Sequence, residues 1–262
     1  MDIAALPWAD LLPFILIGFM AQLIDGSFGM AFGVLSNALL VALGLPPFAA
    51  AAAVRSAEGF TSGVSGLAHA LQRNVDWSLF ARLVVPGILG GLIGAWILIH
   101  IRLDIVRPVM LVYLCATGAY LLWRGSRRPH TFRRLRLVGP LAFFGGLVDT
   151  SGGGGWGPIV TGNLLAQGAT PRVAIGTTSA AEFFVTVTVL AAFIGTLGVG
   201  SFTVAALGLL IGGVAAAPIG AYLARRLPVK PVITIAGVLL IAMGFYGLAS
   251  LAFEPLPIFP RF

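Results

Sequence analysis

Long apolar runs, separated by short polar stretches, make up almost the whole chain. A helix that crosses a bilayer needs about 20 apolar residues. Four continuous runs reach this length: Leu79–Ile99, Val173–Leu197, Phe202–Leu223 and Val232–Phe253. Two further apolar stretches, Leu11–Leu43 and Leu137–Leu165, are interrupted by glycines and polar side chains. The pattern predicts an all-α polytopic integral membrane protein with two broken segments.

The two broken stretches align with each other at a constant offset of 124 residues. The first is broken around Asp25–Gly33. The identical pairs are Asp25 and Asp149, Ser27 and Ser151, Gly29 and Gly153, and Gly33 and Gly157. The same offset pairs Pro47 with Pro171 and Glu58 with Glu182. We therefore expect two copies of one unit, residues 1–124 and 137–262, joined by a linker at 125–136.

Each copy is expected to contain its broken stretch followed by three transmembrane helices. In the first copy the helices are predicted near Pro47–His69, Trp77–His100 and Ile105–Arg124. In the second copy they are predicted at Pro171–Gly195, Ser201–Arg225 and Pro231–Phe253. Each proline that opens a range lies in a first turn, where a residue without an N–H is tolerated.

Length decides how the broken stretches enter the membrane. As one helix, the 33 residues Leu11–Leu43 would extend about 50 Å, too far for one crossing of a hydrocarbon core about 30 Å thick. Each arm has about 14 residues, or roughly 21 Å, and is too short to cross alone. We therefore expect re-entrant hairpins that turn at mid-membrane. Three full crossings per copy is an odd number, so the two repeats are expected to have inverted topology.

Composition excludes a soluble globular domain. The 262-residue chain is 58% hydrophobic and 10% charged, with a mean hydropathy of +1.01, whereas soluble domains carry about 25% charged residues. Its net charge of +7 is concentrated in and beside the linker, at Arg124, Arg127, Arg128, Arg133, Arg134 and Arg136. A basic cluster can bind nucleic acid or anionic lipid. Here the positive-inside rule explains the cluster and predicts that the linker is cytoplasmic. A nucleic-acid partner is therefore not expected.

The other loop charges follow this orientation in the cell membrane, with one exception. The hairpin topology places these basic residues in the cytoplasm: Arg73, Arg82, Arg225, Arg226 and Lys230. The uncharged loop Leu197–Ser201, the acidic segment Met1–Asp10 and the C-terminus fall outside. Arg102 and Arg107 also fall outside, against the rule. Met1–Asp10 lacks the basic region of a signal peptide, so the first hydrophobic segment is expected to be retained.

The glycine breaks are the predicted substrate site. The second break has four successive glycines: Gly152, Gly153, Gly154 and Gly155. Such backbone does not remain helical, and unpaired backbone groups in lipid are tolerated only beside a cavity or a ligand. A helix that restarts after a break offers free N–H groups and a positive dipole end to an anion. Two such ends, with Gly29, Ser27, Ser151 and Arg55, would hold a small oxyanion. Close helix packing is the alternative role of the glycines.

Ionisable residues lie within the apolar segments, where such groups are costly and are functional by default. They are Asp25, Arg55, Glu58, Asp149 and Glu182. Arg55 and Glu58 are three residues apart on one helix face and can pair, either for function or as a structural ion pair. Glu182 lacks this partner because Ser179 takes the arginine's place. It is expected either to carry a proton or to bond to backbone, and all four carboxyls are candidates for coupling.

Uncharged polar residues complete the candidate site. Thr177, Thr178 and Ser179 can line a substrate path, although such side chains often bond to their own helix. Gln22, Asn37 and Asn163 in the broken arms are expected either to contact substrate or to support the hairpins. Trp156 lies in the second break and is expected either to gate the site or to pack.

Neither a cofactor nor a metal is expected. Cys115 is the only cysteine, which rules out an internal disulfide or a thiolate metal site. His69, His100 and His130 show no metal-ligand spacing, and the chain has no nucleotide-binding loop. Direct use of ATP is therefore not expected.

The second copy contains three motifs in order. They are Ser151-Gly152-Gly153-Gly154-Gly155-Trp156-Gly157-Pro158, Thr170-Pro171 and Ala174-Ile175-Gly176-Thr177-Thr178-Ser179. With the duplicated layout, they resemble the sulfite exporter TauE/SafE family of membrane permeases over nearly the whole chain. The resemblance implies export of sulfite, thiosulfate, sulfoacetate or a similar organosulfonate. The first copy departs from the pattern, because it has fewer glycines in Gly26–Gly33 and Arg55 at the position of Ser179.

Three functions therefore stand beside one another. The first is a secondary transporter that moves a small sulfur-containing anion by alternating access of the two halves, with a proton as a candidate coupling ion. The second is an intramembrane aspartic-type hydrolase, in which Asp25 and Asp149 share a proton. The third is an anion channel or a membrane scaffold that transports nothing.

Overall fold

A computed structural model describes residues 8–30, 32–45, 47–100, 106–127, 135–152, 155–197 and 204–252. In these residues the ordered elements are all helical. The first half contains α1 (Trp8–Phe28), α2 (Phe32–Ala42), α3 (Pro47–Leu71), α4 (Trp77–His100) and α5 (Val106–Arg127). The second half contains α6 (Val138–Gly152), the π-helix η2 (Gly157–Thr161), α7 (Gly162–Gln167), α8 (Pro171–Leu197), α9 (Val204–Arg226) and α10 (Val229–Ala252). The predicted order of elements is confirmed.

Five described helices are long and apolar enough to cross a membrane. They contain the segments Leu11–Phe28, Trp77–Ile97, Pro171–Ala192, Val204–Arg226 and Lys230–Ala249. The sequence also predicts crossings at α3 and α5, which fall outside this group. α3 has 25 residues but carries Arg55 and Glu58, and α5 has arginines near both ends. The chain is an all-α polytopic membrane protein.

Apolar side chains cover the outside of the helix assembly, and polar ones lie within it. Leu16, Val85 and Phe245 are each more than half exposed, whereas Glu58 and Asp149 are less than a tenth exposed. This distribution suits a protein surrounded by hydrocarbon, which solvates apolar side chains and leaves charged ones to pair inside the bundle.

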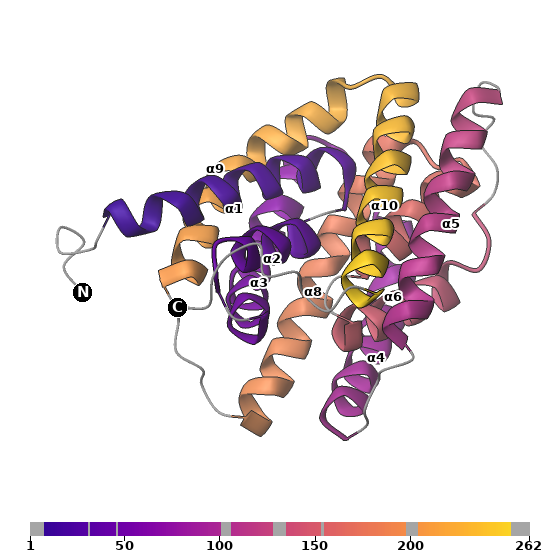
Figure 1. Ribbon diagram of the computed structural model, residues 1–262. Coiled ribbons are helices and arrows are strands. Elements are labelled where there is room, and N and C mark those ends of the chain that lie inside the picture. Colours follow the sequence, from indigo (N-terminus) through magenta and orange to yellow (C-terminus); the bar gives the residue numbers. More distant parts are fainter. Residues whose placement is uncertain are drawn as a thin grey trace.

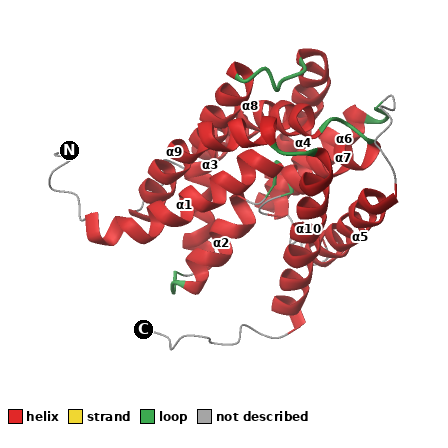
Figure 2. Cartoon of the chain, turned by 90° about the horizontal axis from the view of Figure 1, so that it is seen from above, coloured by secondary structure: helices red, strands yellow, loops and turns green. Residues whose placement is uncertain are grey.

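The most extensive helix contacts come in equivalent pairs. Where one of these contacts joins two helices, their counterparts in the opposite halves are also in contact. α1 packs along α9, and its counterpart α6 packs along α4. α3 contacts both α8 and α9, and its counterpart α8 contacts both α3 and α4. α5 and α10 lie side by side, as both views show (Figures 1 and 2). A two-fold axis relating two copies would produce this exchange. The opposite orientation of the copies in the membrane stays a prediction.

Glycines of each half lie beside the break of the other half. Gly87 on α4 leaves the space that the ring of Trp156 fills. The space beside Gly213 on α9 is filled by Thr61, with Phe32 at a contact distance of 3.6 Å. Phe32 is the residue 124 positions before Trp156. Each half thus packs the first aromatic residue after its break near a glycine of the other half.

The two arms of the first broken stretch are unequal, whereas the sequence predicts arms of similar length. α2 has 11 residues, but α1 has 21 and is long and apolar enough to cross a membrane, so the prediction that each arm is too short to cross is wrong for α1. The helix continues through Asp25 and Ser27, because the Ser27 hydroxyl donates to the carbonyl of Leu23 at 2.6 Å. It ends at Gly29, which has a positive φ of 74°. That backbone conformation favours glycine and commonly closes a helix. The break is therefore shorter than Asp25–Gly33.

Close backbone approach between α1 and α9 makes Gly212 a sensitive position. A Cβ added there would overlap the carbonyl of Ile15 and the amide of Phe19. We expect Gly212→Ala to destabilise the protein by about 1–3 kcal/mol, because one helix must move away from the other. The measurement is the thermal unfolding midpoint of purified protein in one detergent. Gly139→Ala is the control, since its Cβ would lie 3.7 Å from Pro86. Equal midpoints for the two variants would contradict this packing.

Candidate functional site

The two helix breaks lie against each other inside the bundle. The space beside Gly157 in the second break is filled by the carbonyl of Gly29 and by Met30 from the first break. The space beside Gly29 is filled in turn by Thr161 and Ile175. Met30, Gly157 and Thr161 are buried. The structure therefore brings together the two segments that the sequence singles out.

Each break is held by the aspartate that precedes it. Oδ1 of Asp149 accepts hydrogen bonds from the backbone amides of Gly155 at 2.8 Å and Trp156 at 3.0 Å. Oδ1 of Asp25 accepts a longer one, 3.4 Å, from the amide of Phe32. Amides at the restart of a helix have no helical partner, and a carboxylate is a strong acceptor for them. These amides, predicted to be free for an anion, are therefore already bonded within the protein.

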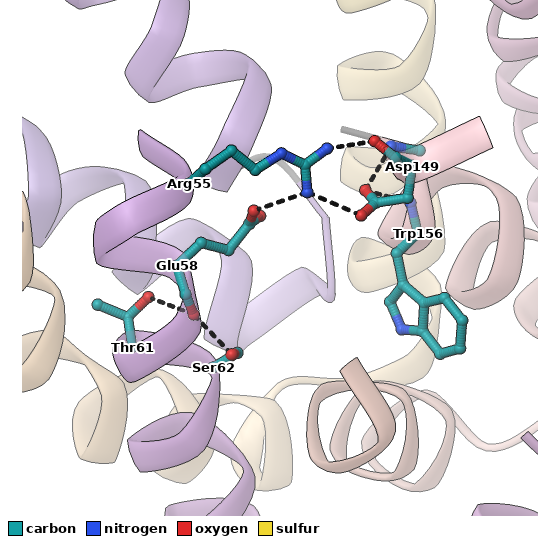
Figure 3. A network of polar contacts seen from close by, with 7 residues as sticks. Arg55, Glu58, Thr61, Ser62, Asp149 and Trp156 are labelled. Atoms are coloured by element: carbon teal, nitrogen blue, oxygen red, sulfur yellow. Dashed lines mark hydrogen bonds and ion pairs between the residues drawn. The ribbon is translucent and has the colours of Figure 1, made fainter. Parts of the chain in front are cut away.

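Arg55 connects α3 of the first half to the break in the second half (Figure 3). Its Nη1 lies 2.9 Å from Oδ2 of Asp149 and 3.3 Å from Oε2 of Glu58. Its Nη2 donates to the backbone carbonyl of Asp149. The pairing of Arg55 with Glu58 is the one expected from their spacing. The pairing with Asp149 joins residues 94 positions apart, and the sequence carries no local signal for it.

Four carboxyl side chains from four helices line a small cavity beside this ion pair. Asp25 comes from α1, Glu58 from α3, Asp149 from α6 and Glu182 from α8. The remaining lining residues are apolar or glycine: Met30, Phe32, Gly33, Gly157, Pro158 and Met243. The candidate coupling residues are thus gathered at one place. Within the described residues, no hydrogen bond or ion pair holds Glu182. This agrees with the sequence, which has Ser179 at the position that matches Arg55.

The hydroxyl groups proposed for the substrate path are largely bonded to the protein. The Thr178 hydroxyl donates to the carbonyl of its own helix at Ala174, 2.8 Å away, and lies 2.7 Å from the Thr161 hydroxyl. The Thr177 hydroxyl accepts from the amide of Asp76 at 2.9 Å. Ser179 is buried. The threonines behave as helix-bonding and loop-holding groups, the alternative that sequence reasoning left open.

The remaining candidates divide between packing and support. Trp156 is 1% exposed, and its indole N–H donates to the carbonyl of Thr178 at 3.1 Å. Figure 3 shows its ring turned away from the Arg55 guanidinium. The Asn163 amide donates to the carbonyl of Ile159 at 2.8 Å and so supports the second hairpin. Within the part of the chain that is described, Gln22 Nε2 and Asn37 Oδ1 are buried without a hydrogen-bond partner.

Some predicted residues lie outside the described part of the chain. Gly153 and Gly154 are not described, nor is the side chain of Ser151, although Ser151 and Gly152 end helix α6. Most of the linker at 125–136 also falls outside. The roles of these residues stay predictions.

Sequence reasoning missed a second polar cluster, around His69. The His69 side chain is fully buried, and its Nε2–H donates to the carbonyl of Gly26 at 3.0 Å. Its Nδ1 accepts from Asn74 Nδ2 at 3.2 Å, which also donates to the carbonyl of Ala221 at 3.1 Å. The cluster ties α1, α3 and α9 together where Gly26 meets Gly220. The sequence offers no pattern that links these residues.

No group of three or more potential metal ligands converges among the described histidine, cysteine, aspartate and glutamate residues.

Comparison with known proteins agrees with this architecture. The family model "Sulfite exporter TauE/SafE" matches residues 14–247. A Bacillus subtilis (strain 168) protein, "Probable membrane transporter protein YtnM", is 37% identical over 225 residues, covering 82% of this chain and 75% of the relative. No solved structure matches the chain significantly. The family and this relative are described as membrane transporters and not as enzymes. Together with its helical membrane fold, the match shows that this chain belongs to the sulfite exporter TauE/SafE family.

Proposed function

We propose that the protein is a secondary transporter that exports a small sulfur-containing anion across the cell membrane. The candidate substrates are sulfite, thiosulfate, sulfoacetate and similar organosulfonates. The observation that carries the proposal is the position of Arg55, a guanidinium at the meeting point of the two helix breaks. The description of the family supports the substrate class.

Arg55 is the group that suits a sulfur oxyanion best. A guanidinium presents several N–H donors in a plane and matches two oxygens of one oxyanion. Its side chain is 24% exposed, whereas that of its partner Asp149 is 5% exposed. The guanidinium is thus less enclosed than its partner, and two of the carboxyl groups that line the cavity, Glu58 and Asp149, are bonded to it. The helix amides contribute less than the sequence predicts, since Asp25 and Asp149 already occupy several of them.

The transport step we propose is a rocking of the two halves about this point. Transporters built from repeats commonly bind their substrate at the repeat interface, near broken helices, and expose it alternately to either side. Arg55 belongs to the first half and Asp149 to the second, so movement of one half against the other changes their contact. One of the cavity carboxyls carries the coupling proton in this scheme.

The hydrolase alternative is less compatible with the geometry. An aspartic dyad requires two carboxyl groups that share a proton over a reacting bond. Here Oδ1 of Asp25 and Oδ1 of Asp149 each hold the amides of their own break. The other oxygen of Asp149 is bonded to Arg55. Both oxygens of Asp149 are thus occupied by contacts other than Asp25, which does not favour a shared proton.

Anion counterflow in proteoliposomes tests the transport function. We expect saturable exchange of sulfite, thiosulfate or sulfoacetate, with sulfate and phosphate as comparison anions. Arg55→Gln should weaken it roughly 10- to 100-fold, the loss typical for hydrogen bonds to a charged group. Arg82→Gln, an exposed arginine that bonds to its own helix, is the control. Equal, unsaturable leakage of every anion would contradict a carrier. Undiminished exchange by Arg55→Gln would contradict the role of that residue.

The two equivalent serines provide a further test. The Ser27 hydroxyl donates its hydrogen bond to the carbonyl of Leu23, so it cannot donate one to an anion at the same time. We propose that Ser151, at the glycine-rich break, donates to the substrate. Ser151→Ala should raise the half-saturating anion concentration roughly 2- to 10-fold, as for one neutral hydrogen bond. Ser27→Ala should have a smaller effect. A larger loss in Ser27→Ala than in Ser151→Ala would show that the assignment is reversed.

A further inference from the structure

The Arg55 guanidinium is shared among acceptors from both halves of the protein. Glu58 is on its own helix, while Asp149 supplies both a carboxylate oxygen and a backbone carbonyl from α6 (Figure 3). These bonds use both N–H groups of Nη1 and one of Nη2, out of the five that a guanidinium has. An anion that binds to Nη1 must therefore replace either Glu58 or the Asp149 carboxylate there.

The two oxygens of the Asp149 carboxyl group have separate functions. Oδ1 holds the amides of Gly155 and Trp156, and Oδ2 holds Arg55. Oδ2 can release the guanidinium while Oδ1 continues to hold the break. A protonated carboxyl group retains this division, because its carbonyl oxygen still accepts two hydrogen bonds while the other oxygen carries the proton. Asp149 can thus lose its charge without loosening the hairpin.

The negative charge of the cavity carboxyls favours uptake of a proton when Asp149 releases Arg55. Asp25, Glu58, Asp149 and Glu182 line one cavity, with Arg55 beside it. An anion that joined these carboxylates at Arg55 would add further negative charge and leave Asp149 charged, buried and without its cation. An unpaired buried charge is strongly unfavourable. Uptake of one proton by Asp149 removes the unpaired buried charge and compensates one unit of the negative charge that the anion brings.

We propose that the anion takes the place of the Asp149 carboxylate at Arg55, and that Asp149 binds one proton on Oδ2 as it releases the guanidinium. The proton comes from the aqueous side from which the anion enters, and no covalent bond of the substrate changes. Anion and proton then bind together and cross together. This inference rests on the proposed transport function and identifies its coupling group.

Other charged groups lie near Asp149. Arg55 and Glu58 face it from α3, Glu182 from α8 and Asp25 from α1. α4, which packs along α6, has a described charged side chain at Arg82, which is exposed and bonds to the carbonyl of Ser78. Among the described side chains of α5, η2 and α6 itself, no other charged group contacts Asp149. Of this set, Asp149 alone carries a carboxylate oxygen on Arg55 from the opposite half.

The equivalent position in the other copy does not offer a second site of this kind. Asp25 matches Asp149, and it also holds the amide of its own break. The position that matches Arg55 is Ser179, which offers no cation. The exchange therefore operates on one side of an otherwise duplicated site.

Binding of thiosulfate to the purified full-length protein, measured calorimetrically at several neutral pH values, tests this exchange. Thiosulfate remains ionised throughout, so its own protonation does not contribute. If one proton accompanies each anion, the affinity falls about tenfold per pH unit while Asp149 is ionised. Buffers of different ionisation enthalpy should report about one proton taken up per anion.

Two matched variants locate the proton. Asp149→Asn keeps an acceptor for Gly155 and Trp156 but carries no charge, so its affinity should not depend on pH. Asp25→Asn makes the same change where the arginine is missing. Its affinity can change, but its pH dependence should remain. A wild-type pH dependence in Asp149→Asn, or its loss in Asp25→Asn, would overturn the assignment.

The wild-type measurement decides the matter even if Asp149→Asn does not fold. Saturable counterflow combined with binding that takes up no proton would overturn the exchange and leave the proposed transport function intact. Absence of counterflow for every sulfur anion would overturn the transport function itself, and the exchange with it.

Discussion

Backbone amides exposed by a broken helix must find acceptors within the protein, because lipid supplies none. This constraint shapes the centre of the molecule. The two breaks meet there, and Asp25 and Asp149 each place a carboxylate oxygen on the amides that follow. The protein thereby acquires buried negative charge where the halves touch. Arg55 compensates part of it by pairing with Asp149 across the two halves. The ion pair at the candidate site is thus a consequence of how the helix breaks are stabilised.

The two halves have equivalent helices, and the candidate site lies where their residues differ. Equivalent helices make equivalent contacts in the two halves, so both breaks are brought to one place. A symmetric frame would offer two identical sites for one small solute. The replacement of arginine by Ser179 in the second copy removes one of them. The two equivalent serines also differ. The Ser27 hydroxyl donates to a carbonyl of its own helix, whereas Ser151 lies at the glycine-rich segment. Each copy therefore contributes a different part to the site.

Membership of the sulfite exporter TauE/SafE family fits a structure whose polar groups are concentrated inside the bundle. Apolar residues form the outer surface. The charged residues inside are stabilised by their contacts with one another. The Arg55 guanidinium is bonded to acceptors of both halves. In the mechanism that we propose, movement of one half against the other changes these contacts.

The sequence by itself determined the membrane class and nearly all helix positions, and it predicted the two copies and the candidate polar residues. Periodic hydrophobicity and glycine breaks are local properties, and an aligned repeat needs no coordinates to be recognised. The pairing of Arg55 with Glu58 could also be predicted, since three residues on a helix share a face. The tertiary structure alone decided that Arg55 reaches Asp149, that Asp149 occupies the predicted anion-binding amides, and that His69 is buried against Gly26. These contacts join helices distant in the chain, and their geometry depends on how the two halves pack.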